Sequence, residues 1–260
     1  MGERNISLDA IVLSIKEMGE TNRQVTFFSA EQGIIYATLY GGARSKMRSL
    51  VQTFNSGRLY LYCDESKKQN KIVDFDVKKV HSTFNSSLYK MTAANLASEI
   101  LVKTKGAGDW EKSFTLINAF VDGMDISSEN EAKIGTIRFL WRYIQILGLQ
   151  PEIHLCGNCQ KSLLDFDHSV FYPFKSKFLC ASCEIIFQLN QNSTGITSPY
   201  FIDKDGITYL NAINTLSPGQ VRQIQISDKS MNYLKVFLMG FLEQITGEKL
   251  KTLEILPGIL

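Results

Sequence analysis

The sequence is poor in the residues that catalysis and metal binding most often use. It has three histidines and five cysteines in 260 residues, and its net charge at pH 7 is only +2. None of the patterns typical of phosphate-binding loops, serine hydrolases or zinc proteases occurs, and the acidic residues are scattered rather than paired. The sequence therefore does not support an enzyme, and its overall charge predicts no particular partner.

Long apolar runs are also absent. The most apolar stretch, residues 137–149, contains Arg138 and Arg142, and no segment reaches the roughly 18 apolar residues of a membrane-spanning helix. The first residues, MGERNISLD, lack the apolar core of a secretory signal. The composition, 44% hydrophobic and 21% charged, is that of an ordinary globular protein. We therefore expect a cytoplasmic protein that does not contact membranes.

The first eighty residues have the pattern of a small β-barrel. Short segments rich in Val, Ile, Phe and Tyr, partly alternating, are separated by glycines and polar turns. We predict strands over residues 10–15, 24–29, 33–40, 58–63 and 72–80. Five short strands with a single long loop after the third fit a closed barrel of the OB type.

The remaining sequence has mainly helical periodicity. We predict helices that begin near Asn85 and near Ser217 and helices that span residues 109–121, 128–147 and 231–245. Ser128 with Glu131, and Ser217 with Gln220, have the spacing of capping boxes. We expect helices on both sides of a cysteine-containing segment to pack together. The predicted fold is α+β, with an OB-fold domain (1–80), a helical domain (81–150 and 184–260) and an inserted metal-binding element (151–183).

Four of the five cysteines form two CxxC pairs, Cys156 with Cys159 and Cys180 with Cys183. A CxxC turn lets two thiolates point at one centre, and two such turns complete a tetrahedron around Zn²⁺. Disulfides do not suit the expected compartment, and a redox CxxC would normally accompany a βαβ pattern, whereas an iron–sulfur cluster stays open. We predict a closed zinc site that stabilises the fold. Cys63, at the end of a predicted strand, is expected to be a small core residue.

A basic loop is predicted between the third and fourth strands. No acidic residue lies between Glu31 and Asp64, and four cations fall there instead: Arg44, Lys46, Arg48 and Arg58. In an extended loop the alternating cations of residues 44–48 would line one side and track the phosphates of a nucleic acid. Five aromatic residues nearby would offer bases a stacking surface: Tyr36, Tyr40, Phe54, Tyr60 and Tyr62. The alternative, a solvated loop with these aromatics buried in the barrel, is equally compatible with the sequence.

The opening segment LDAIVLSIKEMGETNRQVTFFSAEQGIIYATLYGGARS resembles the N-terminal barrel of the bacterial RecO family of recombination mediators. The resemblance lies in an apolar strand, a polar GET turn, a second strand, an acidic-polar-Gly turn, a third strand and a Gly-Ala-Arg basic loop. The later helices and the CxxC…CxxC insertion follow in the order of that family. This chain departs from the family in having Lys177, Phe178 and Leu179, where glycines often precede the second cysteine pair.

The resemblance implies a non-enzymatic, nucleoid-associated protein of homologous recombination repair. It would bind single- and double-stranded DNA, anneal complementary strands, and work with RecR to let a recombinase replace the single-stranded-DNA-binding protein SSB. Arg44, Lys46 and Arg48 match the basic loop that would contact phosphates, and the four paired cysteines match the metal ligands. Arg138 and Arg142 are candidates to hold the acidic C-terminal tail of SSB, although internal pairing stays open. The alternative function is an interaction module of a transcription or translation assembly.

Overall fold

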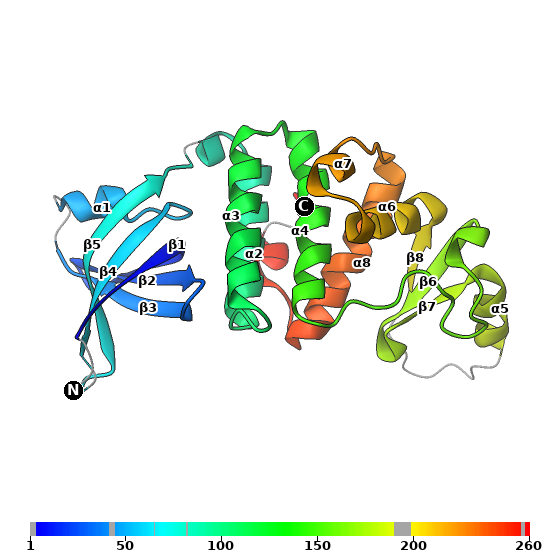
Figure 1. Ribbon diagram of the computed structural model, residues 1–260, viewed down its shortest axis with the longest axis horizontal. Helices are drawn as coiled ribbons and strands as arrows, with labels where there is room; N and C mark the ends of the chain where they lie inside the picture. The colour runs from blue at the N-terminus through cyan, green and yellow to red at the C-terminus, as the bar shows by residue number, and fades with distance from the viewer. Residues whose placement is uncertain (1–3, 42–44, 65, 82, 190–198, 256–257) are drawn as a thin grey trace. The chain divides into compact units, whose positions relative to one another are not determined.

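The computed structural model describes residues 4–41, 45–64, 66–81, 83–189, 199–255 and 258–260 (Figure 1). The chain divides into two compact units, Met1–Gly135 with Leu250–Leu260, and Thr136–Lys249. These units group the chain by packing, so the predicted division into 1–80, 81–150 with 184–260, and 151–183 stays a prediction. None of the described helices is long and apolar enough to cross a membrane.

A closed five-stranded barrel forms the N-terminal part of the first unit. Its strands are β1 (Asn5–Met18), β2 (Asn22–Ser29), β3 (Gly33–Leu39), β4 (Ser56–Asp64) and β5 (Gln69–Lys79). Their order around the barrel is β1-β2-β3-β5-β4, with a parallel contact only between β3 and β5, where Thr38 lies opposite Lys71. The short helix α1 (Lys46–Leu50) lies between β3 and β4 in the sequence. The predicted OB-type barrel is thereby confirmed.

The barrel closes around an apolar interior because alternate strand residues point inward. Val25 and Phe27 of β2, Ala37 of β3 and Leu59 of β4 belong to this buried core. Gly57 marks the closest approach of β4 to β5, since a Cβ there would lie 2.0 Å from the backbone oxygen of Asp76. Glycine is therefore required where the register shifts between these two strands.

Helices complete the first unit. They are η1 (Thr83–Ser86), α2 (Leu88–Lys103), α3 (Trp110–Ile126), the start of α4 (Glu129–Ile146), and α9 (Lys251–Ile255). The predicted caps are confirmed at Asp109, which accepts a hydrogen bond from Lys112 N, and in the box formed by Ser128 and Glu131. The cap of α2 is Ser87 rather than Asn85, because a 3₁₀ turn precedes this helix.

Helix α3 covers one part of the outer barrel surface. The Phe114 ring lies 6.4 Å from that of Phe28 on β2, and a Cβ on Gly33 would lie 2.8 Å from the Trp110 side chain. The outer face near the β2–β3 turn is therefore occupied by the chain itself. The other end of β3, toward Leu39, does not make these contacts.

The second unit combines helices with a three-stranded antiparallel sheet of order β7-β6-β8. Its strands are β6 (His168–Tyr172), β7 (Lys177–Cys180) and β8 (Tyr200–Asp203). Its helices are the rest of α4, α5 (Ala181–Leu189), α6 (Lys204–Thr215), α7 (Pro218–Arg222) and α8 (Asp228–Thr246). Two short 3₁₀ turns, η2 (Leu163–Asp165) and η3 (Pro173–Lys175), complete the unit. The ring of Phe171 on β6 lies 4.9 Å from those of Phe178, Phe237 and Phe241. The capping box of Ser217 with Gln220 and the last apolar helix are confirmed.

Candidate functional site

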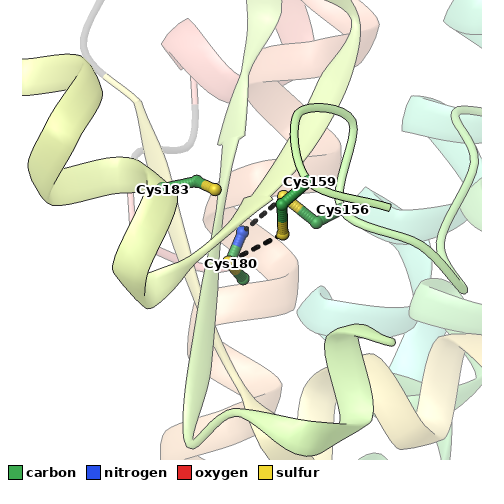
Figure 2. A group of neighbouring side chains, drawn as sticks. All are labelled: Cys156, Cys159, Cys180 and Cys183. Atoms are coloured by element: carbon green, nitrogen blue, oxygen red, sulfur yellow. Dashed lines mark hydrogen bonds between the residues drawn. The ribbon is translucent and has the colours of Figure 1, made fainter. Parts of the chain in front are cut away.

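The two cysteine pairs converge on one point in the second unit. Cys156 and Cys159 lie in the turns before η2, Cys180 ends β7, and Cys183 lies in the first turn of α5. Their four Sγ atoms lie within 4.8 Å of one another (Figure 2). The Sγ atoms of Cys159 and Cys180 are 3.8 Å apart, close to the separation of about 3.8 Å expected for sulfurs bound tetrahedrally at 2.3 Å from one zinc ion. The four thiols thus match the geometry of a metal site.

Backbone and side-chain donors surround the sulfurs. Cys180 N donates to Cys156 Sγ at 3.3 Å, and Asn158 Nδ2 donates to Cys183 Sγ at 3.4 Å. Burial works to raise the pKa of the Cys156 thiol, but N–H groups of Cys159, Cys180 and Asn158 outweigh it and lower that pKa to about 7. Burial raises the pKa of the Cys180 thiol to about 12. Cys180 therefore resists ionisation on its own, and a bound cation would favour its thiolate.

The departure from the family pattern before the second cysteine pair has a structural explanation. Lys177, Phe178 and Leu179 form β7, which pairs with β6. The backbone oxygen of Phe178 accepts a hydrogen bond from Gly157 N at 2.8 Å, and a Cβ on Gly157 would lie 2.9 Å from the Lys177 side chain. Strand β7 therefore holds the first CxxC turn against the second pair. The fold of this element needs no glycine at these three positions.

The basic segment after β3 is not an extended loop in its described part. Lys46 and Arg48 lie in α1, so the expectation that alternating cations line one side of a loop is wrong for these two residues. Side chains two residues apart in a helix are rotated by about 200° around the helix axis, so those of Lys46 and Arg48 point in nearly opposite directions. Lys46 is exposed, and Arg44 lies outside the described residues.

Two of the four candidate DNA-binding cations are tied to the barrel. Arg48 donates to the carbonyl oxygen of Thr21 at 3.0 Å and lies 3.7 Å from the Glu17 carboxylate, and its side chain is only 16% exposed. Arg58 donates to the carbonyl oxygen and hydroxyl of Ser7 at 2.9 and 3.0 Å. Arg58 also lies 3.7 Å from the Asp9 carboxylate. Neither contact could be read from the sequence, because the partners are distant along the chain.

The five aromatic residues near the loop separate into buried and exposed groups. Phe54 is 1% exposed and belongs to the interior, whereas Tyr36 and Tyr40 are 52% and 45% exposed. Tyr60 is half-buried and donates its hydroxyl hydrogen to Asp76. Tyr62 is half-buried and lies beside Lys71. Phe54 therefore fits the interpretation as a buried barrel residue, whereas Tyr36 and Tyr40 are exposed and their stacking on bases stays a prediction.

Two arginines lie beside a buried tyrosine in the second unit, and a third arginine lies near one of the two. Arg138 and Arg142 lie one helical turn apart on α4 and are half-buried. The Tyr209 hydroxyl of α6 is buried, which raises its pKa, and the charges of both arginines and a hydrogen bond from Arg138 act against that rise. Burial, Arg138 and the exposed Arg222 of α7 lower the pKa of Arg142. No ion pair joins Arg138, Arg142 or Arg222 to a carboxylate in the described part of the chain, so the cluster is suited to an external anion.

Comparison with known proteins identifies the family. The family model "Recombination protein O N terminal" matches residues 1–81, and "Recombination protein O C terminal" matches residues 85–254. The chain belongs to the RecO family. It is 22% identical to the DNA repair protein RecO of Moorella thermoacetica over 94% of this chain and 87% of the relative. It is 27% identical to that of Shouchella clausii over 94% of this chain and 90% of the relative.

The RecO assignment confirms the resemblance drawn from the barrel segment and the cysteine pattern. RecO proteins are non-enzymatic recombination mediators, so the family also confirms that the chain is not an enzyme. The chain is a DNA repair and recombination protein with an N-terminal barrel and a four-cysteine cluster that is suited to a metal such as zinc. Arg222 and Tyr209 were missed by sequence reasoning, because no spacing along the chain connects them with Arg138 and Arg142.

Proposed function

We propose that this RecO protein binds single- and double-stranded DNA without sequence specificity and anneals complementary strands. With RecR, it would help a recombinase to load on single-stranded DNA that SSB covers. The observation that carries the proposal is the match of both halves of the chain to RecO, together with an OB-type barrel. Annealing requires two polyanions to approach each other, and a basic surface lowers their repulsion without reading bases.

We assign the phosphate contacts first to Arg44 and Lys46. Lys46 is exposed at the start of α1, and no ion pair joins it to a described carboxylate. Arg48 and Arg58 match the predicted basic surface, but each already donates to a backbone carbonyl within the barrel. They contribute positive charge from side chains that the barrel holds in place. DNA binding by this surface is therefore expected to weaken steeply with salt.

The salt dependence of oligonucleotide binding tests this assignment. Replacing Arg44 and Lys46 together by Ala removes two phosphate contacts, so the slope of log affinity against log salt is expected to fall by about 1.4 for a single strand. Lys229→Ala, at an exposed lysine of the second unit, is the matched control and is expected to leave the slope unchanged. An unchanged slope in the double variant would place the DNA surface elsewhere.

We further propose that the four cysteines hold one zinc ion. Cys156, Cys180 and Cys183 are buried, all four sulfurs lie within 4.8 Å of one another, and thiolate sulfur is the donor that zinc prefers in closed sites. With four protein ligands no position is left for a substrate. The metal would stabilise β6, β7 and the start of α5 against one another rather than take part in chemistry.

The arginine cluster of the second unit supports a second binding site. We assign Arg138 and Arg142, with Arg222, to the acidic C-terminal tail of SSB. No ion pair joins their guanidinium groups to a described carboxylate, and the buried Tyr209 hydroxyl lies beside Arg138 and Arg142. A carboxylate held by two guanidinium groups would satisfy these donors at once. This site would bring the protein to SSB-covered strands independently of the barrel.

Binding of a tail peptide tests the second site. Arg138→Ala and Arg142→Ala are each expected to weaken binding of the SSB tail peptide about tenfold, because each removes a charge-assisted hydrogen bond. Lys229→Ala is again the control. A peptide of the same charge that lacks the terminal aromatic residue separates specific recognition from simple attraction. Equal binding of the peptide by all variants would contradict the assignment of these arginines.

A further inference from the structure

Two exposed tyrosines stand on the open end of β3. Tyr36 and Tyr40 are 52% and 45% exposed, whereas Ala37 and Leu39 between them belong to the barrel core. Since side chains alternate across a strand, both tyrosines point away from the core. Phe28 and Gly33, near the other end of this part of the barrel, pack against α3, whereas the tyrosine end stays exposed among the described residues. Exposed aromatic rings of this size on a barrel wall are suited to a flat partner.

A lysine and a third tyrosine extend this surface across the neighbouring strands. Lys71 of β5 lies opposite Thr38 of β3 on one side and Tyr62 of β4 on the other. Its Nζ is 5.7 Å from the ring centroid of Tyr40 and 5.9 Å from that of Tyr62. A ring on β4 and a ring directly after β3 therefore flank one ammonium group. We call Tyr36, Tyr40, Tyr62 and Lys71 the tyrosine–lysine face.

The charge of this face is not neutralised within the described residues. No ion pair joins Lys71 to a described carboxylate, whereas Lys78, farther along β5, pairs with Asp9 at 2.8 Å. Tyr60 on β4 provides a contrast, because its hydroxyl bonds Asp76 at 3.2 Å and that hydrogen bond raises its pKa. The carboxylates of Asp76 and Asp74 beside Tyr60 would repel a phosphate backbone, whereas none of the four residues of the tyrosine–lysine face is acidic. The face thus combines π-surfaces with one available cation.

We propose that the tyrosine–lysine face stacks unpaired nucleobases and gives the protein a preference for single-stranded DNA over duplex. The proposal rests on the proposed DNA binding and assigns it a substrate form. Every base has a π-face, so stacking on tyrosine tolerates any sequence, and Lys71 lies where it can meet the adjoining phosphate. In a duplex the bases are already stacked on one another and present only their edges. The face therefore gains nothing from a duplex except the charge of Lys71.

Three ligands of equal length separate stacking from charge: a thymidine strand, a sugar-phosphate strand without bases, and a duplex. Tyr36→Ala with Tyr40→Ala is expected to weaken binding of the thymidine strand about tenfold or more. Binding of the other two ligands is expected to stay unchanged, because they offer phosphates without an accessible base face. Tyr60→Ala, on the same barrel, is the control. The variant with Phe at both positions is expected to retain thymidine binding, since the ring persists.

The outcomes distinguish this proposal from the one it rests on. If the wild type binds the thymidine strand and the baseless strand equally, stacking is refuted. The protein would then bind DNA through its phosphates alone. A loss of equal size for all three ligands in the double Ala variant would also refute stacking, because the rings would then act through the fold. If the wild type binds none of the three ligands, the proposed DNA binding fails and the stacking proposal fails with it.

Discussion

The His81 ring lies between two oxygen atoms from different parts of the first unit. Its Nε2 is 3.0 Å from the Asp122 carboxylate of α3, and its Nδ1 is 2.9 Å from the carbonyl oxygen of Phe54. Lys79 contacts the other oxygen of Asp122. Both oxygens only accept, so the ring satisfies both contacts when both nitrogens carry a proton. His81 thereby joins the segment before β4 to the third helix.

Asp122→Asn is expected to lower the melting temperature by an amount that depends on pH. Burial works to raise the pKa of Asp122, but hydrogen bonds from Lys79 and His81 outweigh it and lower the pKa below its usual 3.8. A carboxyl group whose pKa is lower in the folded than in the unfolded protein stabilises the fold at pH values above its pKa in the unfolded protein. This stabilisation is lost as the pH falls through its pKa in the folded protein. Thermal unfolding at about pH 7 and below about pH 3 measures the effect.

The melting-temperature difference between wild type and Asp122→Asn is therefore expected to shrink on acidification. Glu31→Gln, at an exposed carboxylate of the β2–β3 turn, is the control and is expected to show a small difference at both pH values. A difference for Asp122→Asn that stays constant down to the lower pH would show that its charge does not stabilise this junction.

Glu99 ties the C-terminal helix to α2. Its carboxylate accepts hydrogen bonds from Lys251 N at 2.7 Å, Thr252 N at 2.9 Å and Thr252 Oγ1 at 2.7 Å. Glu99→Ala leaves these donors without their acceptor, so we expect a cost of about 1–3 kcal/mol. Hydrogen exchange of the amides in α9 is expected to accelerate, whereas Glu111→Ala on α3 leaves it unchanged. Equal protection of α9 in both variants would contradict the role of Glu99.

The proposed zinc site predicts one zinc ion per chain by elemental analysis. Cys156→Ser with Cys159→Ser removes two ligands and is expected to abolish zinc binding and to lower the melting temperature, because binding and folding of this element are coupled. Cys63→Ser is the matched control, since Cys63 lies in the barrel wall and is not one of the four clustered cysteines. Iron in place of zinc, or full zinc content in the double variant, would contradict the proposal.

Arg48 and Lys46 are expected to behave oppositely although only one residue separates them. Arg48→Ala removes the hydrogen bond to the Thr21 carbonyl oxygen and the ion pair with Glu17. We expect the melting temperature to fall, because the carbonyl oxygen loses its donor and the carboxylate loses its cation. Lys46→Ala removes an exposed charge and is expected to weaken DNA binding while leaving the melting temperature within about 2 °C. The two measurements together separate charge that holds the barrel from charge that meets DNA. The reverse pattern would contradict both assignments.

Local patterns predicted the barrel and much of the helical part. The period of two and the spacing of the glycines located the strands, and short capping motifs located Ser128 and Ser217, because these signals involve residues close in sequence. Strands β6, β7 and β8 and helices α1, α5 and α6 were missed. Strand β8 has four residues and pairs with β6 across a long separation, and α1 has five residues and no side-chain cap.

The candidate sites could be predicted where their residues follow a recognisable spacing along the sequence. The CxxC pairs converge as their pattern predicts, since one turn and one strand-to-helix junction bring the four thiols together. The sequence predicted that the segment after β3 is basic. It could not predict that Arg48 is largely buried, because this depends on a contact with the turn at Thr21, which is distant along the chain. The position of Arg222 beside Arg142 depends in the same way on how α7 packs.

The most direct test of the account is annealing of complementary oligonucleotides that are each covered with SSB. We expect the wild-type protein to accelerate annealing and the combination of Arg44→Ala with Lys46→Ala to abolish the acceleration. Arg138→Ala with Arg142→Ala is expected to slow annealing of SSB-covered strands only, leaving bare strands unaffected. If folded, zinc-loaded protein does not accelerate annealing, the account is contradicted, and an interaction module that scaffolds another assembly becomes the better explanation of the barrel and the cysteine cluster.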